Sequence, residues 1–91
     1  MRYSIQDKKL QKLADGQPVK GYPPELGKAF RKCLNYIKAA KNIRDLQAMR
    51  SLHCEEYRER RERSLRLNDQ YRLMFLLEAE EIVICSIEDY H

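Results

Sequence analysis

Residues 24–40 carry the feature that most constrains the fold, an apolar stripe with helical spacing. Its members recur at intervals of three and four residues, which makes one side of a helix apolar: Leu26, Ala29, Phe30, Cys33, Leu34, Ile37 and Ala40. Pro24 near the first turn and Glu25 at the positive end of the helix dipole both favour a helix start here. The opposite side is mostly basic, so the apolar side is expected to pack against the rest of the chain.

The chain after Asn42 changes from helical spacing to alternation. Residues 43–49 are expected to form a short helical or irregular link, and strands are expected at 50–57, 63–68, 71–79 and 81–91. "NDQ" and "EAEE" supply the turns between the last three strands. Near the start, "RYSI" is β-prone, and Ser4 with Asp7 resembles a capping box for a short helix that ends at Gly16. The sequence therefore predicts an α+β fold with two N-terminal helices on a mainly antiparallel sheet of about four to five strands.

Composition limits the class of protein. The 91 residues are expected to form a single domain, 1–91, and 43% hydrophobic with 35% charged residues fits a soluble globular chain. The longest apolar run, "LMFLL", is too short to cross a membrane, and "MRYSIQDKK" lacks the apolar stretch of a signal peptide, so a cytoplasmic protein with no membrane partner is expected. Three cysteines without C-x-x-C spacing are expected to be reduced thiols.

The positive charge is concentrated in one half of the chain. Residues 1–50 contain 12 Lys and Arg against 4 Asp and Glu, whereas residues 51–91 contain 6 against 10. Attraction to phosphates is local, since salt screens it beyond roughly 10 Å. A basic surface on the first half is therefore more plausible than the net charge of +4 suggests, although a solvated helix face explains the same residues.

Four segments together resemble a known family of toxins. "GYPPEL" opens the basic helix, "SLH" is expected to end a strand, "RSLRLNDQYRLMF" forms a hairpin and "SIEDYH" closes the sequence. In this order they resemble the HigB toxins, the proteic-killer branch of the RelE/ParE superfamily, over a similar length of chain. The resemblance implies a RelE-like toxin of a type II toxin–antitoxin system that needs no cofactor and cleaves mRNA on the translating ribosome. It also implies a helix-turn-helix, HigA-like antitoxin and a possible toxin–antitoxin hetero-oligomer.

The same resemblance implies which residues carry the activity. Its catalytic positions fall on His53, Arg72, Asp89, Tyr90 and His91. Many relatives have a lysine- and glycine-containing loop after the first histidine, whereas this chain has "CEEYRERRER". The residues expected to bind RNA are therefore the arginines of this loop together with two lysines of the basic helix: Arg58, Arg60, Arg61, Arg63, Lys28 and Lys32.

The chemistry of RNA cleavage fits these residue types. The 2′-hydroxyl has to lose a proton, the 5′-oxygen has to gain one, and the charge on the phosphorane has to be offset. Histidine performs either proton transfer near neutral pH, and arginine binds phosphate as a bidentate fork. Alternation places Asp89 and His91 on one side of the last strand, and Tyr90 would stack on a base if the end of the chain bends.

Structural roles explain some of the same residues. His53 beside Leu52 in a strand fits a half-buried, hydrogen-bonded side chain, and Arg72 fits an ion pair with Glu78 or Glu88. The carboxylates and the two histidines lack the spacing of a metal site. Two other functions stay open from the sequence: a ParE-like non-catalytic toxin that binds a protein such as DNA gyrase, and a nucleic-acid-binding module without killing activity.

Overall fold

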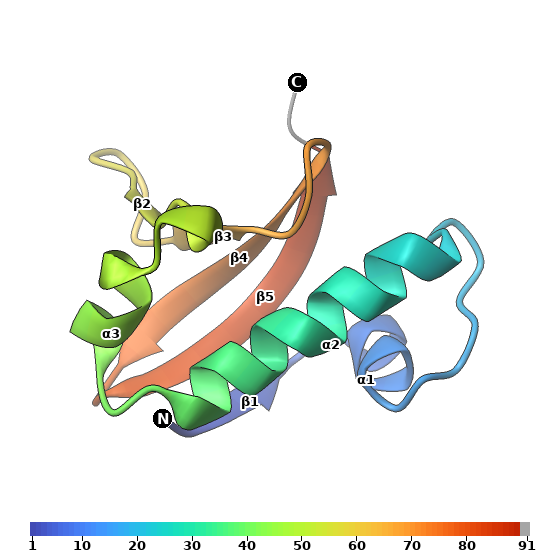
Figure 1. Ribbon diagram of the computed structural model, residues 1–91, viewed down its shortest axis with the longest axis horizontal. Helices are drawn as coiled ribbons and strands as arrows, with labels where there is room; N and C mark the ends of the chain where they lie inside the picture. The colour runs from blue at the N-terminus through green and yellow to red at the C-terminus, as the bar shows by residue number, and fades with distance from the viewer. Residues whose placement is uncertain (90–91) are drawn as a thin grey trace.

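A computed structural model describes residues 1–89, in which helices pack against a five-stranded sheet (Figure 1). The order along the chain is β1 (Tyr3–Ile5), α1 (Lys8–Ala14), α2 (Pro24–Ala39), α3 (Ile43–Ala48), the 3₁₀ helix η1 (Arg50–Leu52), β2 (Glu55–Glu56), β3 (Arg63–Arg66), β4 (Tyr71–Glu78) and β5 (Glu81–Asp89). The predicted α+β class is confirmed, and the expected link at 43–49 is the short helix α3.

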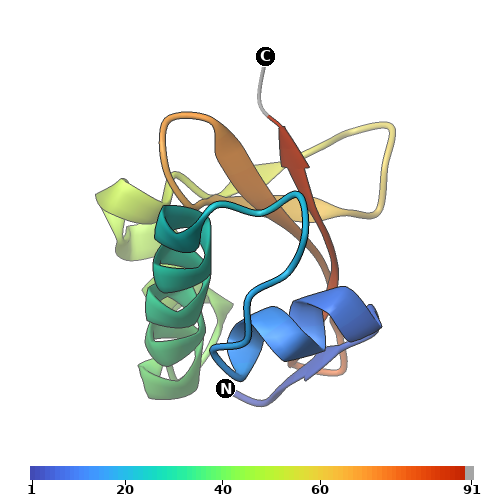
Figure 2. The ribbon, with the colours of Figure 1, turned by 90° about the vertical axis from the view of Figure 1, so that its right-hand side faces the viewer.

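The sheet has the strand order β1-β5-β4-β3-β2. β1 runs parallel to β5, and the other neighbours are antiparallel. The last strand therefore lies inside the sheet, between the first strand and the β3–β4 hairpin. Figure 2 shows α2 on one side of the sheet and the β2–β3 connection extending away on the other side, past β5.

The core forms between α2 and the adjacent face of the sheet. The helix buries the predicted stripe, with Phe30 and Ile37 fully inaccessible to solvent. Leu65, Leu73 and Ile84, one from each of β3, β4 and β5, are also fully buried in the same cluster. Burial of large side chains of this kind contributes about 1.5–3 kcal/mol each. The amphipathic helix thus fixes which face of the sheet is covered by α2.

The short helix α1 begins later than the sequence predicts. Ser4 lies in β1 rather than at the helix start. Asp7 caps the helix instead, since its Oδ1 accepts hydrogen bonds from the backbone N–H groups of Lys9 (2.7 Å) and Leu10 (3.3 Å). The predicted capping box at Ser4 is therefore wrong, because parallel pairing with β5 holds residues 3–5 extended.

The predicted turns close the antiparallel hairpins. The side-chain oxygen of Asn68 accepts hydrogen bonds from the N–H groups of Gln70 and Tyr71, which shapes the β3–β4 turn. Ala79 and Glu80 connect β4 to β5 with φ angles of 49° and 64°. Two successive left-handed residues give a two-residue turn the twist that a hairpin needs.

The largest correction concerns residues 50–57, which were expected to form one strand. Arg50–Leu52 form η1, and the strand β2 covers only Glu55–Glu56. The N–H of His53 donates to the carbonyl oxygen of Arg50, and Leu52 turns into the core with 4% of its surface exposed. His53 follows in a left-handed conformation (φ 43°), so it lies on a tight turn and not in a strand.

Candidate active site

Arg72 is the buried centre of a polar cluster on β4. Only 5% of its side chain is exposed, and its guanidinium contacts Ser64, His53 and Glu55. Nε donates to Ser64 Oγ at 2.8 Å, Nη2 donates to the carbonyl oxygen of His53 at 2.6 Å, and Nη1 lies 3.6 Å from Glu55 Oε1. A buried charge is tolerated when it is paired and hydrogen-bonded in this way. Glu55 is thus an ion-pair partner of Arg72, which the sequence did not suggest, while Glu88 and Glu78 form ion pairs with Arg60 and Arg61.

His53 presents its imidazole to solvent beside this cluster. Its side chain is 66% exposed, and Nε2 lies 3.5 Å from Glu55 Oε1. A left-handed backbone is costly for a residue other than glycine, by about 1–3 kcal/mol. The hydrogen bond from Arg72 to the His53 carbonyl helps to hold that conformation. The expected half-buried strand position is therefore wrong, and the side chain is open to a large substrate.

Sequence reasoning missed the role of three residues in this cluster. Ser64 is fully buried on β3, and its Oγ lies 3.0 Å from the hydroxyl of Tyr57. The register places Glu55 opposite Ser64, and Ser64 opposite Met74 on β4. Contacts between residues so far apart in the chain depend on this register, which the sequence does not reveal. The one signal was local: Glu55 follows His53 by two residues.

Asp89 marks the end of the described part of β5, near Arg72 in the sheet. It pairs with Tyr71, one step beyond the pair of Arg72 with Glu88, and one carboxylate oxygen accepts a hydrogen bond from Gln70 Nε2 at 3.2 Å. The predicted catalytic residues Tyr90 and His91 lie outside the described residues. The structure thus brings His53 and Arg72 into contact and places the strand that leads to residues 90–91 alongside Arg72.

The arginines of the β2–β3 connection and of the start of β3 lie among carboxylates. Arg60 is close to Glu62 and 3.4 Å from Glu88, Arg61 is 3.8 Å from Glu78, and Arg63 is 3.4 Å from Glu56, while Arg58 is exposed. Exposed ion pairs of this kind contribute little to stability, typically about 0–1 kcal/mol. Phosphate binding by Arg58, Arg60, Arg61 and Arg63 stays a prediction, and it requires RNA to compete with these internal partners.

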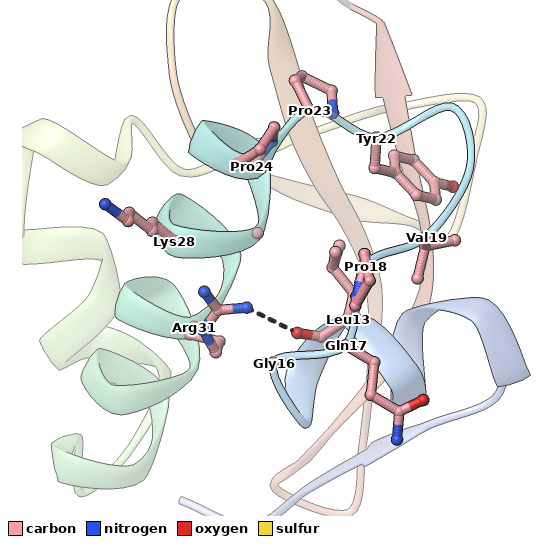
Figure 3. A pocket seen from close by; sticks show the side chains of 11 residues that line it. Leu13, Gly16, Gln17, Pro18, Val19, Tyr22, Pro23, Pro24, Lys28 and Arg31 are labelled. Atoms are coloured by element: carbon pink, nitrogen blue, oxygen red, sulfur yellow. Dashed lines mark hydrogen bonds between the residues drawn. The ribbon is translucent and has the colours of Figure 1, made fainter.

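The two lysines predicted to bind RNA are exposed on α2. Lys28 borders a half-open cavity between α2 and the α1–α2 connection, in which Arg31 Nη1 donates to the carbonyl oxygen of Leu13 at 2.9 Å (Figure 3). Lys32 borders a second hollow together with Ser51 and Leu52, directly before His53. RNA binding by Lys28 and Lys32 stays a prediction.

Nucleophilic catalysis by a cysteine and metal binding have less support around His53. Cys54 is half-buried, and burial raises the pKa of its thiol despite the opposing effect of Arg63 and Arg72. A protonated thiol is a poor nucleophile, so Cys54 and His53 do not form an activated pair. No group of three or more His, Cys, Asp or Glu side chains in residues 1–89 is arranged to hold a metal ion. Over the same residues, no helix is both long and apolar enough to span a bilayer.

The architecture is that of a RelE-like α+β protein. The chain resembles a chain of the solved structure "YoeB-YefM complex from Staphylococcus aureus" with a TM-score of 0.60 and 15% sequence identity. The match covers 100% of this chain and 97% of that chain. At this level of identity the likeness shows the fold.

The family is shown by the sequence itself. Residues 3–91 match the family model HigB-like toxin, described as the RelE-like toxin of type II toxin-antitoxin system HigB. The chain belongs to this family, and the predicted resemblance is confirmed. No curated protein sequence matches the chain.

Proposed function

We propose that this toxin is a ribosome-dependent endoribonuclease that cleaves mRNA during translation in the cytoplasm. The observation that carries the proposal is the arrangement of His53. Its imidazole is exposed, and its backbone carbonyl oxygen is bound by the buried Arg72. An exposed histidine on a rigid support suits proton transfer to or from a macromolecular substrate.

The reaction follows from the chemistry of RNA. The imidazole of His53 takes the proton of the 2′-hydroxyl, the 2′-oxygen attacks the neighbouring phosphorus, and the bond from phosphorus to the 5′-oxygen breaks. The leaving oxygen needs a proton, and His91 is the proposed donor. Asp89 is proposed to orient His91, and Tyr90 is proposed to stack on a base.

Arg72 supports this chemistry in two ways. It binds the carbonyl oxygen of His53, and its positive charge is proposed to stabilise the charge that develops on the phosphorane. Direct contact of Nη1 with a phosphate oxygen would displace Glu55, which lies 3.6 Å away. Contacts with the rest of the RNA are proposed for Lys28, Lys32, Arg58, Arg60, Arg61 and Arg63, and they should weaken as salt rises.

The proposed partners are the ribosome with its mRNA and an antitoxin. A solved structure with this fold is named as a complex of YoeB with YefM, which supports a toxin–antitoxin hetero-oligomer for this chain. The resemblance to HigB toxins favours a HigA-like helix-turn-helix antitoxin. A neighbouring reading frame encoding such a protein, and its co-purification with this chain, would support the assignment.

The proposed activity is tested by inducing the chain in a bacterial host and mapping transcript 5′ ends. New ends inside translated frames are expected, and purified RNA without ribosomes should stay intact. Growth arrest with intact transcripts would refute mRNA cleavage and point to a ParE-like toxin that binds a protein such as DNA gyrase. Normal growth at full expression would leave a nucleic-acid-binding module as the better explanation.

A further inference from the structure

We propose that Glu55 is a positioning residue, which keeps the proton of the neutral His53 imidazole on Nε2 and leaves Nδ1 to accept the proton of the 2′-hydroxyl. The inference rests on the proposed function and adds the residue that sets the state of the proposed base. It starts from one juxtaposition: Glu55 Oε1 lies 3.5 Å from His53 Nε2 and 3.6 Å from Arg72 Nη1.

Each of the three residues contacts the other two. Arg72 binds the main chain of His53, Glu55 lies against its side chain, and Arg72 and Glu55 lie against each other. Arg72 is in turn bound to the buried Ser64 of β3. The strands β2, β3 and β4 therefore hold both the backbone and the imidazole of His53 in one orientation. A side chain that is 66% exposed would otherwise move among several rotamers.

The position of Glu55 also selects a tautomer. In a neutral imidazole one ring nitrogen carries the proton and the other accepts. A carboxylate beside Nε2 stabilises the tautomer with the proton on that nitrogen, as an acceptor next to one nitrogen does in other histidine sites. The lone pair is then on Nδ1, which is the nitrogen that can take a proton from RNA.

The charge of Glu55 argues against its contact with the RNA backbone. A carboxylate repels phosphate, and 31% of this side chain is exposed. Positive charge from Arg72 offsets part of that repulsion at close range. The scissile phosphate is therefore expected to approach the Nδ1 side of the ring, away from Glu55.

The matched pair of variants for the test is Glu55→Gln and Glu56→Gln. Both remove one negative charge from β2, but Glu56 pairs with Arg63 and its side chain is 68% exposed. Cleavage would be measured on ribosomes programmed with a defined mRNA. For Glu55→Gln we expect kcat to fall by about 10–100-fold with little change in KM, because a misoriented base slows chemistry without weakening RNA binding. Glu56→Gln should retain wild-type kcat, and Glu55→Asp should recover part of the loss because it restores the charge.

A second measurement reads the tautomer directly. The ¹⁵N chemical shifts of the His53 imidazole, recorded on the full chain at a pH where the ring is neutral, distinguish a proton on Nε2 from one on Nδ1. We expect the Nε2–H form in the wild type and in Glu56→Gln, and a mixture in Glu55→Gln. A mixture in the wild type, or an unchanged tautomer in Glu55→Gln, would overturn the inference.

The two proposals fail in different ways. A wild-type chain that cuts no transcript refutes the proposed function. Cleavage by the wild type together with wild-type kcat in Glu55→Gln refutes the role of Glu55 and leaves the proposed function standing. An increase in activity in Glu55→Gln would show that the carboxylate only repels RNA.

Discussion

Replacing Arg72 with lysine should weaken both the fold and the activity, although the charge is kept. The guanidinium donates to Ser64 Oγ and to the His53 carbonyl through different nitrogens and also contacts Glu55. An ammonium is a compact group that cannot reach both acceptors with the same geometry. Losing one of two hydrogen bonds to a charged group, of about 1.5–3 kcal/mol each, lowers the free energy of unfolding by the same amount, roughly 1.5–3 kcal/mol. For a domain of this size that corresponds to a fall in Tm of roughly 6–24 °C.

The effect on cleavage is expected to be larger than the effect on folding at the assay temperature. Loss of a single group that stabilises developing charge typically costs about 2.7–4 kcal/mol, or roughly 10²–10³ in rate. The assay would compare thermal melts by circular dichroism with cleavage on programmed ribosomes, at a temperature where the variant is fully folded. Both measurements are needed because Arg72 binds the backbone of His53, so its replacement can reduce cleavage by altering the local structure as well as by removing charge stabilisation.

Arg66→Lys is the matched control. Arg66 lies directly opposite Arg72 in the β3–β4 pairing, but its side chain is 43% exposed and pairs with Asp69. A surface change of this kind usually alters stability by less than about 0.5 kcal/mol. Equal melting temperatures for the two lysine variants, with normal cleavage by Arg72→Lys, would refute the role of the buried guanidinium.

The other predictions concern His53, the last two residues and Cys33. His53→Ala should abolish transcript cleavage, measured by mapping 5′ ends, and should keep the fold because the side chain is exposed. His53→Asn should do the same, and asparagine tolerates a positive φ better than alanine does. Normal cleavage by either variant would remove His53 from the site. Deleting Tyr90 and His91 should remove activity without a large fall in Tm, since the core residues of β5 precede the cut; an active truncation would exclude a catalytic role for both. Burial raises the pKa of the Cys33 thiol to about 12. At pH 8, iodoacetamide should therefore label Cys33 in the unfolded chain but not in the folded chain, as measured by mass spectrometry. Rapid labelling of the folded chain would contradict the burial.

Local patterns were sufficient to predict much of the fold. The stripe over residues 24–40 depends only on helical spacing, and it is the buried side of α2. The turns at Asn68 and at Ala79–Glu80 depend on side-chain and backbone chemistry within a few residues, and they lie where the sequence predicts them. These features could be read because each is determined within one segment.

The error at His53 has a different origin. Apolar Leu52 and Cys54 on either side of a histidine fit a strand by alternation, but the turn at His53 is stabilised from β4 by Arg72, 19 residues away. The pairing of Arg72 with Glu55 likewise depends on the order β2-β3-β4 in the sheet. Alternation in a single sequence carries no information about which strands become neighbours, and so the contacts within the candidate site became visible only with the fold.

The central place of β5 has a consequence for biosynthesis. β1 is the first strand to be made, yet its partner in the sheet is β5, which is the last. Until β5 has been synthesised, β1 has no neighbour, and the core lacks Ile82 and Ile84. The emerging chain therefore cannot complete its native sheet while β5 is still to be translated. Completion of the sheet is therefore tied to the end of translation, because β1 gains its partner only when β5 has been made.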